Sequence, residues 1–301
     1  MLPQSPWVAL SRVSGIGPRT FARLVSRFGS PEQVLTAPER ELIALGRLSP
    51  EMAAHITQNG NHLAELDAEL CAVMRSGIAI LTRDSPDYPG NLAVCAEAPP
   101  VLFLRGQITE GDQRAVAIVG TRTPERRAAQ ASEQIARRLA EQGVTVVSGL
   151  AIGLDTAAHR GALTGGGQTL AVIGSGLDRI YPRRNLRLSE KISAHGAVVS
   201  ELLPEATVSA ENLLARNRII AGLSRAVVVV QSQARGGALV AAQHALDCGR
   251  PVFGLDWPEP KYHEGAQRLL EKGGALLASA SDLEPLLEAA ECSIKRQERL
   301  R

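Results

Sequence analysis

Arginines and small residues occur together at several points of this 301-residue sequence. Arg122 stands in a Gly-Thr-Arg-Thr-Pro segment, and Arg216 and Arg218 flank an asparagine in an Ala-Arg-Asn-Arg segment. A guanidinium group can donate two parallel hydrogen bonds to a phosphate or a carboxylate. Small residues leave backbone amides open to an anion where a helix begins. These residue types predict an anion-binding site.

The elements that would position these residues are those of a parallel sheet. From residue 114 onward, apolar runs without polar alternation separate amphipathic segments. Strands that are buried on both faces have this composition, which indicates a mostly parallel sheet of the α/β class with helices on both faces. The segment after Pro124 carries apolar residues at helical spacing with arginines between them. The predicted strands occupy residues 115–119, 144–147, 168–173, 197–199, 226–230, 251–255 and 275–278.

The carboxyl ends of parallel strands meet at one edge of a sheet, where open sheets bind their ligands. The loops after the first five predicted strands therefore form one rim. Helices that begin near Pro124, Gly153 and Gly237 would point their amino ends at this rim. Between residues 209 and 250, five arginines stand against two acidic residues. Some rim arginines could instead pair with acidic neighbours, namely Asp155, Asp178, Glu201 or Glu205.

Other kinds of chemistry find less support in these residues. A dinucleotide is a poor fit, because the first turn lacks the G-x-G-x-x-G spacing and Ser148 stands where an acidic ribose ligand would end the second strand. Asp155 and His159 share a helical face. They could act as a catalytic base and the group that orients it, or Asp155 could cap or brace its helix while His159 packs beneath the rim. The sequence favours the structural role. We therefore expect no catalysis and no cofactor.

The composition excludes further classes of site. The four cysteines lie far apart without a C-x-x-C pair, which is typical of thiols in a reducing cytoplasm rather than of metal ligands. No run of about eighteen apolar residues appears, and the N-terminus lacks the layout of a signal peptide. We therefore expect a cytoplasmic protein with no metal and no membrane contact. The formal net charge of +2 says little about partners.

The chain divides into three predicted parts. Residues 1–70 form a small helical domain, 71–290 hold the sheet, and 291–301 are a short basic tail. A glycine turn at residues 15–17 between two helical segments is similar to a helix-hairpin-helix, whose turn amides and following Arg19 could hold a DNA phosphate. The alternative for this region is a plain helical adaptor with a glycine turn.

Six motifs give the chain a resemblance to a known family. VAIVGTRTP, VVSGLAIGLDTAAH, GSGLDRIYPRRN, VVSE, ARNRIIAGLS and RGGALVAAQHAL, in this order and spacing, resemble the DprA/Smf DNA-processing family. Upstream, the family's lead-in is matched by Tyr88-Pro89, Leu92, Pro99-Pro100, Leu102 and Gly106, and the resemblance covers about residues 85–280.

The resemblance implies both a fold and a function. It implies an extended Rossmann-like domain that follows the small helical domain in the sequence. It implies a non-enzymatic homodimer that binds single-stranded DNA and loads the RecA recombinase during natural transformation or DNA processing. We expect the dimer to form through roughly residues 237–290. Rim and resemblance together predict these DNA-binding residues: Gly120, Thr121, Arg122, Ser148, Gly149, Gly174, Ser175, Arg183, Arg184, Leu213, Arg216, Asn217, Arg218, Arg235, Gly236 and Gly237.

The sequence also departs from the family pattern. Leu213 and Leu214 stand where the family usually has an aromatic residue followed by proline, so a base-stacking ring is missing there. Trp257 or Tyr262 could replace it in part, although Trp257 could equally plug the end of the sheet. Gln231 replaces the family's usual glutamate. We also expect the winged-helix domain that ends many relatives to be missing here.

Two other functions are alternatives to DNA binding. A LOG-type phosphoribohydrolase is similar around a glycine turn followed by a catalytic glutamate. Here Gln243 follows the Gly236 turn, and no acidic residue occurs before Asp247. A partner-docking scaffold without DNA binding is the third possibility, and the retention of Arg122 and Arg216 argues against it.

Overall fold

The structure is a computed structural model that describes residues 1–233, 236–255, 257 and 260–292. It divides into two compact units. The first comprises Met1–Tyr88 and Ala96–Phe103, and the second comprises Pro89–Cys95 and the chain from Leu104 onward. Most of the predicted basic tail lies outside the described residues.

The first unit is built mainly from six short helices. Proline occupies an early position of α2, α3 and α5, where its missing amide hydrogen would have no partner within the helix. Ser30 and Ser49 cap α3 and α5 by accepting hydrogen bonds from backbone amides. The elements are α1 (Ser5–Ser11), α2 (Pro18–Phe28), α3 (Pro31–Thr36), α4 (Glu39–Ala44), α5 (Pro50–Asn61), α6 (Leu63–Arg75) and β1 (Ala79–Thr82).

The predicted glycine turn separates α1 from α2. Gly15 has a φ of +84°, a conformation that glycine adopts without strain. Arg19, in the first turn of α2, forms an ion pair with Glu97 at 2.9 Å. The core of this unit includes Leu10, Leu24, Leu42, Ile56 and Leu70, all fully buried.

Seven strands of the second unit form a parallel sheet, and all seven predicted runs are strands. Their order is β6-β5-β4-β3-β7-β8-β9, and every neighbouring pair among them is parallel. The predicted α/β class with a mostly parallel sheet is therefore confirmed. The strands are β3 (Ala115–Val119), β4 (Thr145–Ser148), β5 (Thr169–Val172), β6 (Gly196–Ser200), β7 (Ala226–Val229), β8 (Val252–Leu255) and β9 (Ala275–Leu277).

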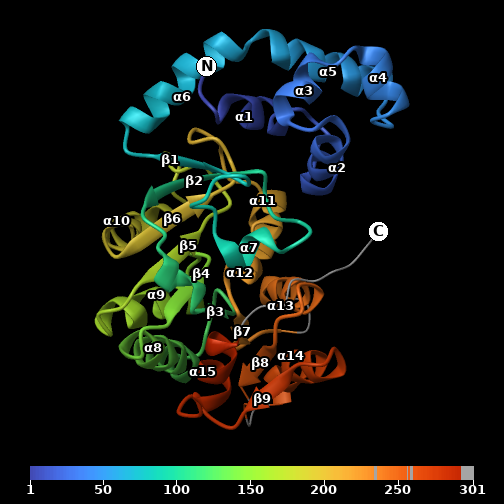
Figure 1. Cartoon of the computed structure of the whole chain (residues 1–301). Coiled ribbons are helices and arrows are strands. Elements are labelled where there is room, and N and C mark those ends of the chain that lie inside the picture. The colour runs from blue at the N-terminus through green and yellow to red at the C-terminus, as the bar shows by residue number, and fades with distance from the viewer. Residues whose placement is uncertain (234–235, 256, 258–259, 293–301) are drawn as a thin grey trace. The chain divides into compact units, whose positions relative to one another are not determined.

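Helices cover both faces of this sheet. Figure 1 shows α8, α9 and α10 on one side of the strands and α12, α13 and α14 on the other. The helices are α8 (Arg126–Glu141), α9 (Leu154–Thr164), α10 (Leu186–Ala194), α11 (Ala210–Ala215), α12 (Asn217–Leu223), α13 (Gly237–Asp247), α14 (Pro260–Glu271) and α15 (Glu284–Glu291). The remaining short elements are α7 (Gly90–Ala93), β2 (Val101–Gly106), which is next to β6 in the sheet order, and the 3-10 turns Glu110–Gln113 and Arg183–Asn185.

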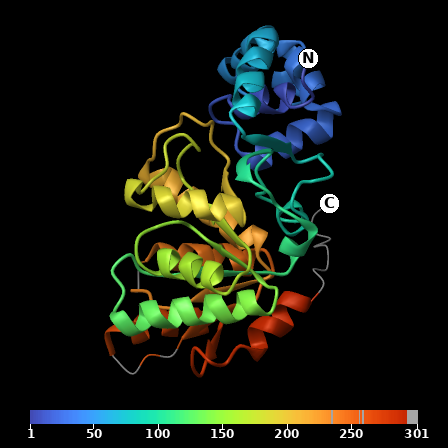
Figure 2. The same ribbon diagram turned by 90° about the vertical axis from the view of Figure 1, so that its left-hand side faces the viewer.

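Helices α8 and α9 pack side by side, as Figure 2 shows. Small residues allow the close approach: a Cβ at Gly161 would lie 2.2 Å from the carbonyl oxygen of Glu133. Ile135 and Leu139 of α8 are fully buried against the sheet. This packing holds the amino end of α9 at the carboxyl edge of β3 and β4.

The described residues hold neither a membrane-spanning helix nor a metal-binding cluster. No helix in this part of the chain is both long and apolar enough to cross a bilayer. No group of three or more histidine, cysteine, aspartate or glutamate side chains in it is arranged to hold a metal ion.

Candidate functional site

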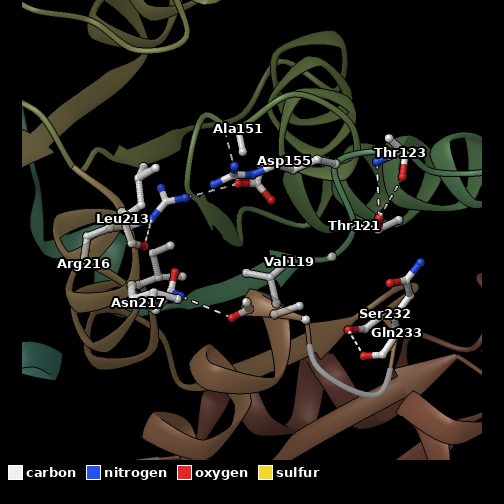
Figure 3. A pocket seen from close by; sticks show the side chains of 18 residues that line it. Val119, Thr121, Thr123, Ala151, Asp155, Leu213, Arg216, Asn217, Ser232 and Gln233 are labelled. Atoms are coloured by element: carbon white, nitrogen blue, oxygen red, sulfur yellow. Dashed lines mark hydrogen bonds and ion pairs between the residues drawn. The ribbon is translucent and has the colours of Figure 1, made fainter. Parts of the chain in front are cut away.

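A cavity of about 470 Å³ opens at the carboxyl ends of β3 and β7 (Figure 3). We call it the rim cavity. Its walls come from the loops after β3, β4 and β7 and from α11 and α12. Among the predicted site residues it contains Gly120, Thr121, Arg122, Leu213, Arg216, Asn217, Gly236 and Gly237. Arg235 lies outside the described residues.

A smaller cavity of about 50 Å³, here called the side cavity, shares part of its wall with the rim cavity. The shared residues are Arg122, Ala151, Leu213 and Arg216. Its remaining wall consists of Gly149, Ile152, Tyr181 and Pro182. The side cavity therefore brings the loop after β5 next to the turn that carries Arg122.

The turn after β3 is fixed at both ends by one residue, Gln231. The amide of Thr121 donates to the Gln231 carbonyl oxygen at 2.9 Å. The amide of Glu125 donates to the Gln231 side-chain oxygen at 3.2 Å. Arg122 lies between these two anchors and is exposed. The turn thus presents a guanidinium at the mouth of the cavity.

Gly153, which begins α9, packs against the same turn. Its φ of +87° favours glycine, and a Cβ there would lie 2.6 Å from the Thr121 carbonyl oxygen and 2.8 Å from that of Arg122. The start of α9 and the Arg122 turn therefore fix each other's position.

Arg216 differs from Arg122 because its side chain is buried. Its guanidinium donates to the carbonyl oxygens of Gly149 and Val172. Its Nε donates to the Leu213 carbonyl oxygen at 3.4 Å, and its Nη2 lies 3.8 Å from an Asp155 carboxylate oxygen (Figure 3). Arg216 therefore joins the ends of β4 and β5 to α9 and α11.

Burial governs the charges beneath the rim cavity. Burial raises the pKa of Asp155, although the Arg216 charge opposes this shift. Burial lowers the pKa of Arg216, although Asp155 opposes that shift. The Ala151 amide donates to the Asp155 carboxylate at 3.2 Å. Asp155 thus braces the start of its helix, as the structural alternative predicted.

His159 is fully buried and lines neither cavity. The Thr169 hydroxyl donates to the Val146 carbonyl oxygen at 2.7 Å, so its oxygen accepts from Nδ1 of His159, also at 2.7 Å. Burial, with a smaller effect of the Arg216 charge, lowers the pKa of His159 to about 3. The ring is therefore neutral and engaged in packing, which agrees with the structural alternative.

The other predicted arginines fall into two groups. Arg218 forms an ion pair with Glu201, so two of the acidic partners considered from the sequence, Asp155 and Glu201, do bind rim arginines. Arg183 and Arg184 are exposed in the 3-10 turn before α10. They remain available to a ligand outside the two cavities.

Like Arg183, Arg184 and Arg218, three small residues among the predicted positions line neither cavity. Ser148 is fully buried, and its hydroxyl donates to the Ile118 carbonyl oxygen at 2.6 Å. Ser175 is also fully buried. A Cβ at Gly174 would lie 2.9 Å from the Asn212 carbonyl oxygen, so this glycine allows α11 to approach. The three residues pack the rim from below.

Sequence reasoning missed Asn185, which ties two rim loops together. Its side-chain amide donates to the Leu150 carbonyl oxygen at 2.8 Å and to the Thr156 hydroxyl at 2.9 Å. Leu150 has a φ of +58°, a strained conformation that the surrounding loops must hold. The sequence signal for Asn185 is its position directly after Arg183 and Arg184, at the end of an arginine-rich loop.

Trp257 closes the end of the sheet. Its indole nitrogen donates to the Val230 carbonyl oxygen, and the guanidinium of Arg127 lies 5.0 Å from the ring centroid. The ring packs against the core between the sheet and α8. Of the two roles considered for Trp257, these contacts favour the plug. The side chain of Tyr262 lies outside the described residues.

Comparison with known proteins shows where this chain belongs. Residues 79–288 match the DNA recombination-mediator protein A family, and residues 4–58 match the DprA-like N-terminal HHH domain. Protein Smf of Synechocystis sp. is 37% identical over 288 residues, which cover 93% of this chain and 71% of that protein.

Solved structures agree with the sequence matches. The DNA processing protein A of Streptococcus pneumoniae aligns with a TM-score of 0.78 and 29% identity, over 94% of this chain and 98% of that one. The DNA processing protein A of Helicobacter pylori, which binds single-stranded DNA, aligns with a TM-score of 0.62 and 28% identity, over 70% and 96%. The resemblance seen in the motifs is confirmed, and the chain belongs to the DNA recombination-mediator protein A family.

Proposed function

We propose that this chain binds single-stranded DNA at the rim and side cavities and catalyses no reaction. The observation that carries the proposal is the exposed Arg122, on a turn held at both ends, at the mouth of a cavity of about 470 Å³. That volume is in the range of about 300–1,000 Å³ common for small-ligand sites. The similar protein from Helicobacter pylori binds single-stranded DNA, which supports the same class of ligand.

Phosphate contacts would supply most of the affinity. Arg122, Arg183 and Arg184 are exposed, and the first residues of α13 lie in the cavity wall, where helix amides favour an anion. Such contacts follow the DNA backbone and do not distinguish bases. Binding should therefore tolerate any sequence. It should weaken as the salt concentration rises, because salt cations compete with the arginines for the phosphates.

The cavity favours single strands over duplex DNA. An unpaired nucleotide can enter a recess, whereas a paired one must first leave the base stack at a cost of a few kcal/mol. The described walls of the two cavities are loops, helix ends and the short helices α11 and α12, which surround a recess and do not resemble the long helix or two-stranded ribbon that enters a major groove. We infer a preference for single strands on this basis.

The engagement of the two acid–base candidates supports a non-catalytic role. Asp155 lines the rim cavity, but its carboxylate accepts from the Ala151 amide and faces Arg216, and His159 lines neither cavity and bonds to Thr169. A LOG-type reaction would need a carboxylate early in α13, and that helix has none before Asp247. We also propose the RecA-loading role, a cytoplasmic location and a homodimer, for which the support is family membership.

A titration at several salt concentrations tests the proposal. Labelled oligo-dT should bind, and its affinity should fall as salt rises. Arg122→Ala should weaken binding to oligo-dT and mixed sequences alike and lower the salt slope by about one contact. Arg137→Ala, on the exposed side of α8, is the matched control and should bind like the wild type. If a folded Arg122→Ala variant binds normally, the site lies elsewhere.

A further inference from the structure

Tyr181 is exposed beside the proposed DNA site. Its side chain is 43% accessible, whereas the other aromatic side chains that the structure describes are buried or half-buried. Its hydroxyl makes no hydrogen bond with any described residue. An aromatic ring that is only partly covered at a cavity wall keeps surface free for contact with a ligand.

The position of Tyr181 relative to Arg122 is the central observation. Both residues line the side cavity, together with Leu213 and Pro182. Arg122 also lines the rim cavity. A strand whose phosphate contacts Arg122 would therefore pass within reach of the Tyr181 ring, with Leu213 as an apolar part of the same cavity wall.

The loop that carries Tyr181 is held at several points. The amide of Asp178 donates to the Pro204 carbonyl oxygen at 2.9 Å, and that of Gly176 donates to the Ala206 carbonyl oxygen at 2.8 Å. Asn185 anchors the far end of the loop at Leu150. A ring on a fixed loop loses little freedom on binding, which makes it an effective stacking surface.

The charge around Tyr181 is positive. Arg179, Arg183, Arg184 and Arg187 are all exposed within six residues of it. The nearest acidic residue along the chain, Asp178, forms an ion pair with Arg105 at 3.0 Å. Arginines that follow a backbone and an aromatic ring that receives bases are the two components of single-strand binding sites.

We infer that Tyr181 stacks on an unpaired base of the strand whose phosphate is bound by Arg122. The inference rests on the proposed function, since it names a base subsite of the same surface. It also supplies the ring that is missing at Leu213, from a different loop. Stacking uses the face of a base and is independent of sequence, as the phosphate contacts are.

The experiment compares oligo-dT with an abasic deoxyribose-phosphate oligomer of the same length. The wild type should bind oligo-dT more tightly than the abasic oligomer. Tyr181→Ala should weaken oligo-dT binding roughly tenfold or more and leave abasic binding unchanged. Tyr181→Phe keeps the ring and should retain the difference, whereas Tyr181→Leu keeps the apolar bulk and should lose it.

Leu186→Ala is the matched control, because Leu186 is 44% exposed on the same segment but lines neither cavity. It should bind both oligomers like the wild type. Equal losses on both oligomers in Tyr181→Ala would assign Tyr181 to loop support and overturn the inference. Unchanged binding of both would also overturn it. Arg122→Ala separates the two proposals: it should weaken both oligomers, and unchanged binding of both would contradict the proposed function itself.

Discussion

Arg122 and Arg216 line the same two cavities, but the first side chain is exposed and the second is buried. Arg122 is exposed on its turn and available to a phosphate. Arg216 is 5% exposed, and its donors face carbonyl oxygens and a carboxylate of the protein itself. Arg216 therefore shapes the site and adds positive potential from below, whereas Arg122 is the arginine that we propose contacts the phosphate.

His159 gives the fold a pH dependence that can be measured. Its pKa is about 3 in the folded chain and 6.5 in the unfolded reference, so the unfolded state binds more protons between these values. Stability should therefore fall as pH decreases through this window, by about 2 kcal/mol between pH 7 and pH 5 from this residue. Urea unfolding at both pH values measures the loss.

The variant His159→Gln removes this titration and keeps a hydrogen-bond donor for Thr169. Asp155, whose pKa is raised, changes stability with pH in the direction opposite to His159, and it does so in both proteins. Its contribution therefore cancels when the stability change of the variant is subtracted from that of the wild type, and the difference isolates His159. His195→Gln, at an exposed position, should behave like the wild type. An identical pH dependence in wild type and His159→Gln would contradict the buried, neutral ring.

At the scale of elements, the strands could be predicted and the side-chain directions at the rim could not. Each uninterrupted apolar run became a strand, because a strand buried on both faces leaves no polar position. The direction of Arg216 and the link between Asn185 and Leu150 depend on loops far apart in sequence. The type and position of a residue along the chain do not determine such contacts, so Asn185 was missed and Ser148 was expected to face the ligand.

Contact between α9 and the Arg122 turn gives an element-scale prediction. Gly153→Ala would place a Cβ within 2.8 Å of the Thr121 and Arg122 carbonyl oxygens at a φ that disfavours alanine. It should destabilise the fold by about 1–3 kcal/mol and weaken single-strand binding, because the turn must move. Thermal unfolding and an oligo-dT titration measure the two effects.

Gly166→Ala is the matched control for this prediction. Gly166 also has a positive φ, +71°, but a Cβ there would meet nothing within 4 Å. It lies between α9 and β5, at the opposite edge of the sheet from the cavities. The variant should lose about 1 kcal/mol of stability from strain alone and keep its DNA affinity. Equal binding by both glycine variants would show that the turn does not depend on α9.

At the scale of the whole molecule, we predict a homodimer through residues 237–290. The alanines of α13 face the core, which leaves Leu239, Val240 and Leu246 half-buried on the other side of the helix. Light scattering at micromolar protein should give twice the mass of one chain, and Val240→Glu should reduce it to one. Leu45→Glu, at an exposed site in the first unit, should remain dimeric. A wild-type monomer at all concentrations would refute the prediction.

The most direct test of single-strand binding is a competition between two forms of DNA. Labelled oligo-dT is bound to the protein, and unlabelled oligo-dT or a blunt oligo-dA·oligo-dT duplex of the same length displaces it at low and high salt. Single strands should displace the label at lower concentration than duplex, with both affinities falling as salt rises. Equal or tighter binding of the duplex would contradict the proposed role of the cavities.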